Sequence, residues 1–280
     1  MKSFFLSCRS KVFDLSKRTY IVGILNVTPD SFSDGGKFQD PEKAIEHAFK
    51  LQNDGADILD IGGESTRPGS EPVSTKEEKE RILPVIKRLA EKLKIPISVD
   101  TYKAEVAEAA IKAGAEIVND ISALRFDPEI GYVVANFEVP VILMHMKDTP
   151  KTMQKNIIYN DLIGEIKEFL YDSIKRAEKA GIESSKMIID PGIGFGKSQE
   201  RDNFLILKEL KNFISLDKPI LVGTSRKSFI KKRLGKDKTD EGTAASLVAA
   251  ILNGANFVRI HDVEKMLPYI KIADNIKYCS

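Results

Sequence analysis

The sequence predicts a (β/α)₈ TIM barrel preceded by a short β-hairpin lead-in, and three observations carry that prediction. Short apolar runs alternate with helix-like segments eight times from residue 20 to the end of the chain. The runs are apolar at consecutive positions and rich in Ile, Val and Leu, as strands buried on both faces are. No glycine-rich dinucleotide fingerprint follows the first run, which disfavours the alternative, a doubly wound open sheet. Parallel strands closed into a barrel are therefore expected.

The individual elements follow from local pattern and capping residues. Residues 1–19 are expected to form a hairpin or an irregular lead-in. Strands are expected at 20–25, 57–61, 96–100, 116–120, 140–145, 187–190, 219–223 and 257–261. Helices are expected at 41–53, 75–93, 103–113, 128–136, 161–180, 202–214, 227–234, 241–253 and 263–272. Asp40 and Thr75 are the predicted N-caps of the first two helices, and Gly114 and Gly181 end the third and fifth.

Composition narrows the class of protein. The 280 residues are 42% hydrophobic and 30% charged, which suits one large globular domain or two small ones. No linker or low-complexity stretch suggests a second domain, so a single barrel domain over residues 1–280 is expected. The 43 basic and 41 acidic side chains nearly cancel, so no nucleic-acid or anionic-membrane surface is expected. Cys8 and Cys279 lack metal-like spacing and indicate a reducing compartment. No apolar run approaches a membrane span. The expected location is cytoplasmic.

Polar residues follow nearly every predicted strand, where a barrel of this kind places its active site. They are Asn26, Asp60, Asp100, Asn119, Asp120, His145, Asp190, Lys227, Arg259 and His261. For Asp60 and Asp120 we prefer a plain structural interpretation, as hydrogen-bonding residues that end a strand. Ending the strands does not explain the whole set. A buried carboxylate costs free energy unless hydrogen-bond donors face it, so these carboxylates suit the binding of a ligand rich in donors.

Two groups within this set indicate a ligand. Acceptors and donors on several sides suit a flat ring with a guanidine-like edge, and they come from Asp100, Asn119, Asp190 and Lys227. A second group, Asn26, Arg259 and His261, lies on the first and last strands, which are neighbours in a closed barrel. It suits phosphate or diphosphate. An ion pair with a neighbouring Asp remains the alternative for Arg259.

Several loops have more than one interpretation. Residues 62–69 are glycine-rich without the Walker ending, so they form no P-loop. Residues 190–197 place three glycines around Phe195, which is either a ring wall or a packing plug. Phe32 is either a loop anchor or a ligand contact. His47, in the first helix, is interpreted as structural or solvent-facing, and no transition-metal spacing is present.

Eight motifs together resemble one enzyme family. GILNVTPDSFSDGG, DIGGESTRPG, SVDT, NDIS, MHMKDTPKTMQ, IDPGIGFGK, GTSRKSFI and RIHDV occur in this order from about Tyr20 to the end of the chain. They are similar to the motifs of the dihydropteroate synthases. The sequence departs from this family at Ala123, where members often have Gly, and in the segment SQERDNF after Lys197.

The resemblance implies an activity. Members condense (7,8-dihydropterin-6-yl)methyl diphosphate with 4-aminobenzoate to give 7,8-dihydropteroate and diphosphate, assisted by Mg²⁺. They are (β/α)₈ barrels, usually homodimers, and sulfonamides inhibit them competitively. Rival interpretations are a methyltetrahydrofolate methyltransferase and a non-catalytic pterin-binding paralogue. The first would not need the SerThrArgPro turn or the Arg-x-His pair, and the second should have lost some of the polar groups.

The resemblance also implies residue roles. The pterin site would comprise Asp100, Asn119, Asp190, Lys227 and Arg259. Diphosphate would bind to Asn26, Arg259 and His261, with Asn26 also contacting the metal. The 4-aminobenzoate site would comprise Ser65, Thr66, Arg67, Pro68, Phe195 and Ser228. Phe32 and Asp34 would belong to a lid loop, which favours the ligand-contact interpretation of Phe32. The expected catalytic residues are Asp100, Lys227, Arg259 and His261, in a dissociative displacement without a protein nucleophile.

Overall fold

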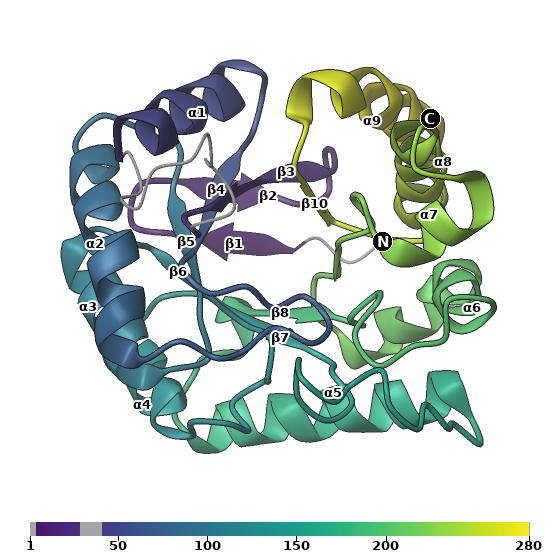
Figure 1. The fold of residues 1–280 in the computed structure, drawn as a ribbon, viewed down its shortest axis with the longest axis horizontal. Helices are drawn as coiled ribbons and strands as arrows, with labels where there is room; N and C mark the ends of the chain where they lie inside the picture. The colour runs from purple at the N-terminus through teal and green to yellow at the C-terminus, as the bar shows by residue number, and fades with distance from the viewer. Residues whose placement is uncertain (1–3, 29–40, 280) are drawn as a thin grey trace.

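Eight parallel strands form the centre of the structure, and helices surround them (Figure 1). The computed structural model describes residues 4–28 and 41–279. The parallel strands are β3 (Tyr20–Asn26), β4 (Ile58–Gly62), β5 (Ile97–Asp100), β6 (Ile117–Asp120), β7 (Val141–Met144), β8 (Met187–Asp190), β9 (Leu221–Val222) and β10 (Phe257–Ile260). The α-helices are α1 (Pro41–Asn53), α2 (Thr75–Ala90), α3 (Ala104–Ala113), α4 (Glu129–Asn136), α5 (Leu162–Lys179), α6 (Asp202–Lys208), α7 (Ser228–Leu234), α8 (Thr239–Leu252) and α9 (Val263–Tyr278).

The strand order confirms the predicted barrel. Hydrogen-bonded neighbours run β8-β7-β6-β5-β4-β3-β10-β9, and every pairing in this sheet is parallel. A parallel bridge from Ile189 to Ile220, just before β9, brings the two ends of the sheet together. The first and last strands, β3 and β10, are direct neighbours. The doubly wound open sheet is excluded.

Side chains alternate between the barrel interior and the helices along each strand. Interior positions near the strand starts form one apolar cluster that includes Val22, Ile58 and Phe257. Their sequence neighbours Ile21, Leu59 and Val258 belong to the larger cluster shared with the helices. Farther along the strands, several interior positions are polar, which concentrates charge at the carboxyl ends, although Ile24 of β3 and Met144 of β7 remain apolar there.

The predicted hairpin is present and packs against the amino ends of the strands. It consists of β1 (Phe5–Ser7) and β2 (Val12–Asp14), which pair antiparallel. Phe13 is wholly buried, with its ring centroid 5.0 Å from that of Tyr20, and the Tyr20 hydroxyl donates to the Asp14 carbonyl at 3.0 Å. The hairpin therefore covers the end of the barrel opposite the polar strand ends.

Three predicted element ends were wrong. Ser74, not Thr75, caps α2, because its hydroxyl accepts the Glu77 amide hydrogen at 3.2 Å. The single helix expected over 202–214 is two pieces, α6 and the 3₁₀ helix η2 (Leu210–Leu216). The last helix continues to Tyr278, since nothing in its sequence stops it at residue 272. Asp40, the predicted cap of α1, lies outside the described residues, and a second 3₁₀ helix, η1 (Ser184–Lys186), precedes β8.

Two further expectations concern membranes and cysteines. Within residues 4–28 and 41–279, no helix is long and apolar enough to cross a bilayer. Both cysteines are free: Cys8 is buried near the hairpin and Cys279 is exposed.

Candidate active site

A buried network of charged and amide groups occupies the carboxyl end of the barrel. Arg259 donates from Nε to Asp60 Oδ2 at 2.6 Å and from an Nη to Asp100 Oδ2 at 2.7 Å. Asn119 donates from Nδ2 to the same Asp60 oxygen at 3.0 Å. All four side chains point inward, because each occupies an interior position of its strand. The alternative interpretation of Arg259, an ion pair with neighbouring aspartates, is therefore seen in the structure.

The network leaves acceptors unused. Asp60 Oδ1 and Asp100 Oδ1 are buried, and within the described part of the chain neither has a hydrogen-bond partner. Burial raises the pKa of Asp100 to about 7, although the nearby Arg259 guanidinium works in the opposite direction. An unpaired buried carboxylate oxygen costs free energy. It is the arrangement expected where a ligand supplies N–H donors.

The prediction for Asp60 needs correction, whereas that for Asp120 is confirmed. Asp60 lies in the middle of β4 and does not end a strand; it holds Asn119 and Arg259. Asp120 points away from the interior, and its carboxylate accepts the backbone N–H groups of Ser122 and Leu124 at 2.7 and 2.6 Å. It shapes the turn after β6.

Asp190 and Lys227 flank the network from the other side of the barrel. Asp190 Oδ1 accepts the Gly192 N–H at 2.7 Å, and burial raises the pKa of this carboxyl. The Lys227 amine donates to the Ile193 carbonyl and lies 4.3 Å from the Phe195 ring centroid. Burial lowers the pKa of Lys227 to about 8, with Asp190 acting against that shift. The glycine-rich loop thus holds the Lys227 amine near Asp190.

His145 was expected among the converging polar groups, but it lies behind them. Its ring packs edge-on against Phe169 at 4.6 Å, and Nδ1 lies 2.5 Å from the Nζ of wholly buried Lys197. Burial lowers the pKa of both groups well below their ordinary values. At Gly192, where φ is +71°, a Cβ would lie 1.8 Å from the His145 carbonyl oxygen. His145 therefore supports the loop.

His261 follows β10 and is oriented by the loop after β9. Its Nδ1 lies 3.0 Å from the Ser225 hydroxyl oxygen, which also accepts the His261 backbone N–H at 3.3 Å. Burial, reinforced by the charges of Arg259 and Arg226, lowers the pKa of His261 to about 3. The ring is therefore neutral at pH 7.

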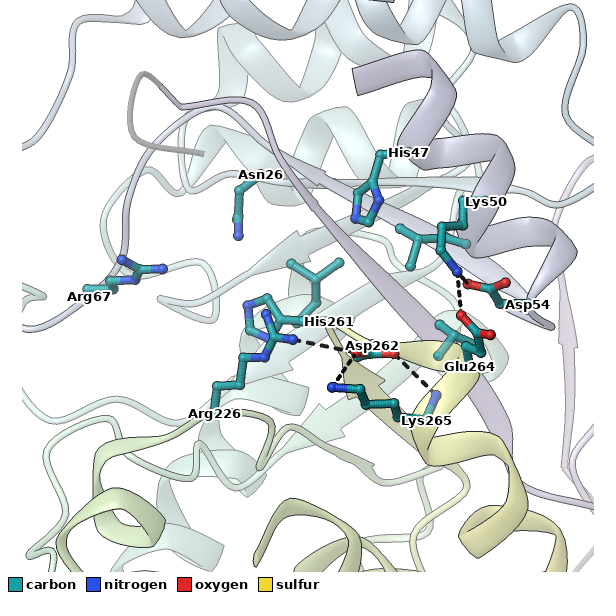
Figure 2. A pocket seen from close by; sticks show the side chains of 13 residues that line it. Asn26, His47, Lys50, Asp54, Arg67, Arg226, His261, Asp262, Glu264 and Lys265 are labelled. Atoms are coloured by element: carbon teal, nitrogen blue, oxygen red, sulfur yellow. Dashed lines mark hydrogen bonds and ion pairs between the residues drawn. The ribbon is translucent and has the colours of Figure 1, made fainter. Parts of the chain in front are cut away.

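A cavity of about 750 Å³ lies beside His261 (Figure 2). Asn26 from the end of β3 and Arg67 from the loop after β4 line it, and both side chains point toward the space around His261. His47 of α1 lines the same cavity from another side. The cavity thus joins elements from the start, the middle and the end of the chain.

Comparison with known proteins identifies the family. A family model described as "Pterin binding enzyme" matches residues 22–261. Dihydropteroate synthase of Synechocystis is 50% identical over 266 residues, covering 94% of this chain and 92% of the relative. That of Bacillus subtilis is 46% identical, covering 92% of this chain and 88% of the relative. The chain belongs to the dihydropteroate synthase family.

Solved structures of dihydropteroate synthases agree over the whole length. The Xanthomonas albilineans enzyme with 4-aminobenzoic acid is 41% identical, with a TM-score of 0.92 and full coverage of both chains. The Yersinia pestis enzyme in complex with a sulfonamide drug is 40% identical, also with a TM-score of 0.92, covering 99% of this chain and 100% of that one. Their fold is the barrel described above.

The residues expected at the 4-aminobenzoate site of this family member occupy three loops. Ser65, Thr66, Arg67 and Pro68 lie between β4 and α2, in a turn where the Ser70 hydroxyl donates to the Ser65 carbonyl at 2.5 Å. Phe195 packs partly against an apolar cluster of Ile121 and three methionines, which agrees with the plug interpretation, and its role as a ring wall stays a prediction. Ser228 is exposed at the start of α7. Phe32 and Asp34 lie outside the described residues.

The sequence analysis did not predict the positions of three residues at the candidate site, Asp60, Ser225 and His47. The role of Asp60 had a signal, since it alternates with Ile58 and so shares the interior face. Ser225, which orients His261, lies in the motif GTSRKSFI, but nothing in that motif predicted a contact with His261. His47 was assigned to structure or solvent, yet it faces the cavity, because the helical pattern of α1 does not show what lies beyond its buried edge.

Proposed function

We propose that this chain condenses (7,8-dihydropterin-6-yl)methyl diphosphate with 4-aminobenzoate to 7,8-dihydropteroate, releasing diphosphate. The observation that carries the proposal is the buried network of Asp60, Asp100, Asn119 and Arg259, with an Asp100 oxygen lacking a partner among the described residues. Family membership supports the same reaction.

The pterin is assigned to the network and its flanks. Asp100 would accept N–H donors of the ring through its unpaired oxygen, and Asn119 and Asp190 would offer further polar contacts. Lys227 would donate to a ring oxygen or nitrogen. Arg259 is wedged between two carboxylates, so its flat guanidinium is held rigidly enough to stack on the ring.

The diphosphate is assigned to Asn26, Arg259 and His261. His261 is neutral and held by Ser225, so it would act as a hydrogen-bond donor rather than as a charge. Arg259 supplies positive charge at the same place. These groups would stabilise the negative charge that grows on the leaving oxygen.

Mg²⁺ is proposed as the cofactor, held mainly by the diphosphate. Among the described residues there is no group of three or more His, Cys, Asp or Glu that could hold a metal ion. Asn26 lines the cavity, and no hydrogen bond within the described chain holds its side-chain amide, whose oxygen could bind a metal ion. One protein oxygen plus substrate phosphates suits Mg²⁺, which keeps several waters. When bound, the ion neutralises charge on the leaving diphosphate.

The reaction we propose is a dissociative displacement. The bond between the pterin methylene carbon and the diphosphate oxygen breaks first, and its electron pair leaves with diphosphate. Ionised Asp100 stabilises the cationic pterin, and the amine of 4-aminobenzoate then attacks the methylene carbon and loses a proton to solvent. The loops carrying Ser65 to Pro68, Phe195 and Ser228 would hold the amine in position, with Phe32 and Asp34 in a lid.

One assay tests the function. The protein is incubated with both substrates and Mg²⁺, and dihydropteroate is measured by chromatography, with and without a sulfonamide. Product formation that the sulfonamide suppresses competitively with 4-aminobenzoate is expected. If pterin binds but no product forms, the chain is a non-catalytic paralogue. If a methyl group is instead transferred from methyltetrahydrofolate, the methyltransferase alternative holds.

A further inference from the structure

His47 lies on the border between the core-facing side of α1 and the cavity beside His261. Ala44 and Leu51, three positions before it and four after it, are buried in the core. The His47 ring is half-buried and projects into the cavity (Figure 2). Its backbone is held in the middle of a helix, so the direction of its ring is well defined.

Two lysines near α1 that line the cavity already have partners, and Arg67 lines it from the loop after β4 rather than from α1. Lys50 lies 2.8 Å from Asp54 and 2.7 Å from Glu264. Lys265 lies 2.8 Å from Asp240. By contrast, no hydrogen bond within the described part of the chain reaches the His47 ring. Whatever its protonation state, an imidazole offers at least one N–H donor.

The groups assigned to the diphosphate come from only two adjacent strand ends, those of β3 and β10. Asn26 and His261 follow β3 and β10, which are adjacent strands, so both approach the diphosphate from the barrel rim. The cavity continues from them toward α1 and is far larger than one phosphate group. A phosphate that extends from the rim into the part of the cavity beside α1 would meet His47.

We propose that His47 donates a hydrogen bond to the terminal phosphate of the pterin diphosphate. This assignment rests on the proposed function and adds to it a binding residue from a helix. His47 holds the leaving group at the α1 side of the cavity while the rim residues hold the oxygen that departs from carbon.

Two variants separate binding from structure. His47→Leu keeps bulk and removes the donor, whereas His47→Gln keeps an N–H at similar reach. Titration calorimetry with inorganic diphosphate in Mg²⁺-containing buffer should show roughly tenfold weaker binding for His47→Leu, with most of the affinity restored in His47→Gln. Binding of 6-hydroxymethylpterin, which lacks the diphosphate, should be unchanged. Glu46→Gln, at an exposed neighbouring position, is the control.

Steady-state kinetics provide a second measurement. In His47→Leu, kcat/KM for the pterin diphosphate should fall roughly tenfold while the KM for 4-aminobenzoate stays constant. Wild-type diphosphate affinity in His47→Leu would overturn the assignment, as would an equal loss of hydroxymethylpterin binding, which indicates a structural role. If the wild-type protein binds diphosphate through His47 yet makes no dihydropteroate, the proposed function fails and the assignment of His47 stands.

Discussion

Asp60 Oδ2 lies 2.6 Å from Arg259 Nε, across the interior of the barrel. Their strands, β4 and β10, both flank β3, and the carboxylate is wholly buried. Since the same oxygen also accepts from Asn119, one buried acceptor sets the positions of two groups assigned to the pterin. Asp60 is therefore a supporting residue. Its loss should weaken ligand binding by displacing Arg259 and Asn119.

Replacing Asp60 by Asn should lower kcat/KM for the pterin diphosphate by roughly ten- to hundredfold, because Arg259 loses one of two counter-charges and turns from its place. Asp120→Asn is a matched control, also wholly buried but facing away from the interior. It should lower the free energy of unfolding by about 1–2 kcal/mol and leave kcat/KM near the wild-type value. Equal kinetic losses in both variants would contradict this account of Asp60.

Removing the Lys227 amine should weaken pterin binding and slow turnover. Lys227→Ala loses a charge-assisted donor, which corresponds to a roughly 10- to 100-fold loss of pterin affinity. Lys231→Ala, on the exposed side of the same helix, controls for helix stability. Affinity is measured by calorimetry and turnover by product formation. Kinetics indistinguishable from wild type in Lys227→Ala would remove this residue from the site.

The titration of Asp100 predicts a pH dependence of pterin binding. Its pKa in the folded protein is about 7, so the ionised form that accepts ring N–H donors becomes dominant only above neutrality. Affinity for 6-hydroxymethylpterin should therefore rise from pH 6 to pH 8, with a midpoint near 7. Asp100→Asn should bind weakly at every pH; a step that survives in this variant would assign the titration to another group.

The raised pKa of Asp100 also makes the stability of the folded protein depend on pH. The folded-state pKa of Asp100 exceeds the ordinary value of 3.8, so the folded protein binds this proton more tightly than the unfolded chain does. The contribution of Asp100 to stability is full below about pH 4 and is lost as the pH rises through 7. Urea unfolding gives the free energy of unfolding of the wild type and of Asp100→Asn at pH 5 and pH 8. Relative to the wild type, the variant should be more stable at pH 8 than at pH 5.

Ala123 offers a route to higher stability. Its φ is +53°, a left-handed conformation that costs an L-residue about 1–2 kcal/mol, and it is wholly buried in the turn after β6. Ala123→Gly removes that strain but adds freedom to the unfolded chain, for a net gain of about 0.5–1 kcal/mol. Ala109→Gly, within the regular helix α3, should instead lose about 1 kcal/mol. Denaturant unfolding checks both signs.

Sequence by itself predicted the barrel, the hairpin and the cluster of polar residues at the strand ends that forms the candidate site. These follow from local information: eight apolar runs each followed by a helix, and polar residues where the runs end. The positions of Asp100, Asn119, Asp190 and Arg259 could be read from strand boundaries. Their roles as pterin contacts, and those of Phe32 and Asp34 in a lid, stay predictions.

Only the tertiary structure decided which of the polar groups meet. Asp60 and Asp120 look alike in sequence, but the register of the closed barrel turns one toward Arg259 and the other toward a backbone turn. His145, expected among the polar strand ends, is buried behind the site, whereas His47, expected to be structural or solvent-facing, faces the cavity. The periodicity of a strand or helix is determined by a few neighbouring residues. Contacts between side chains on different strands depend instead on the stagger of the strands in the closed barrel.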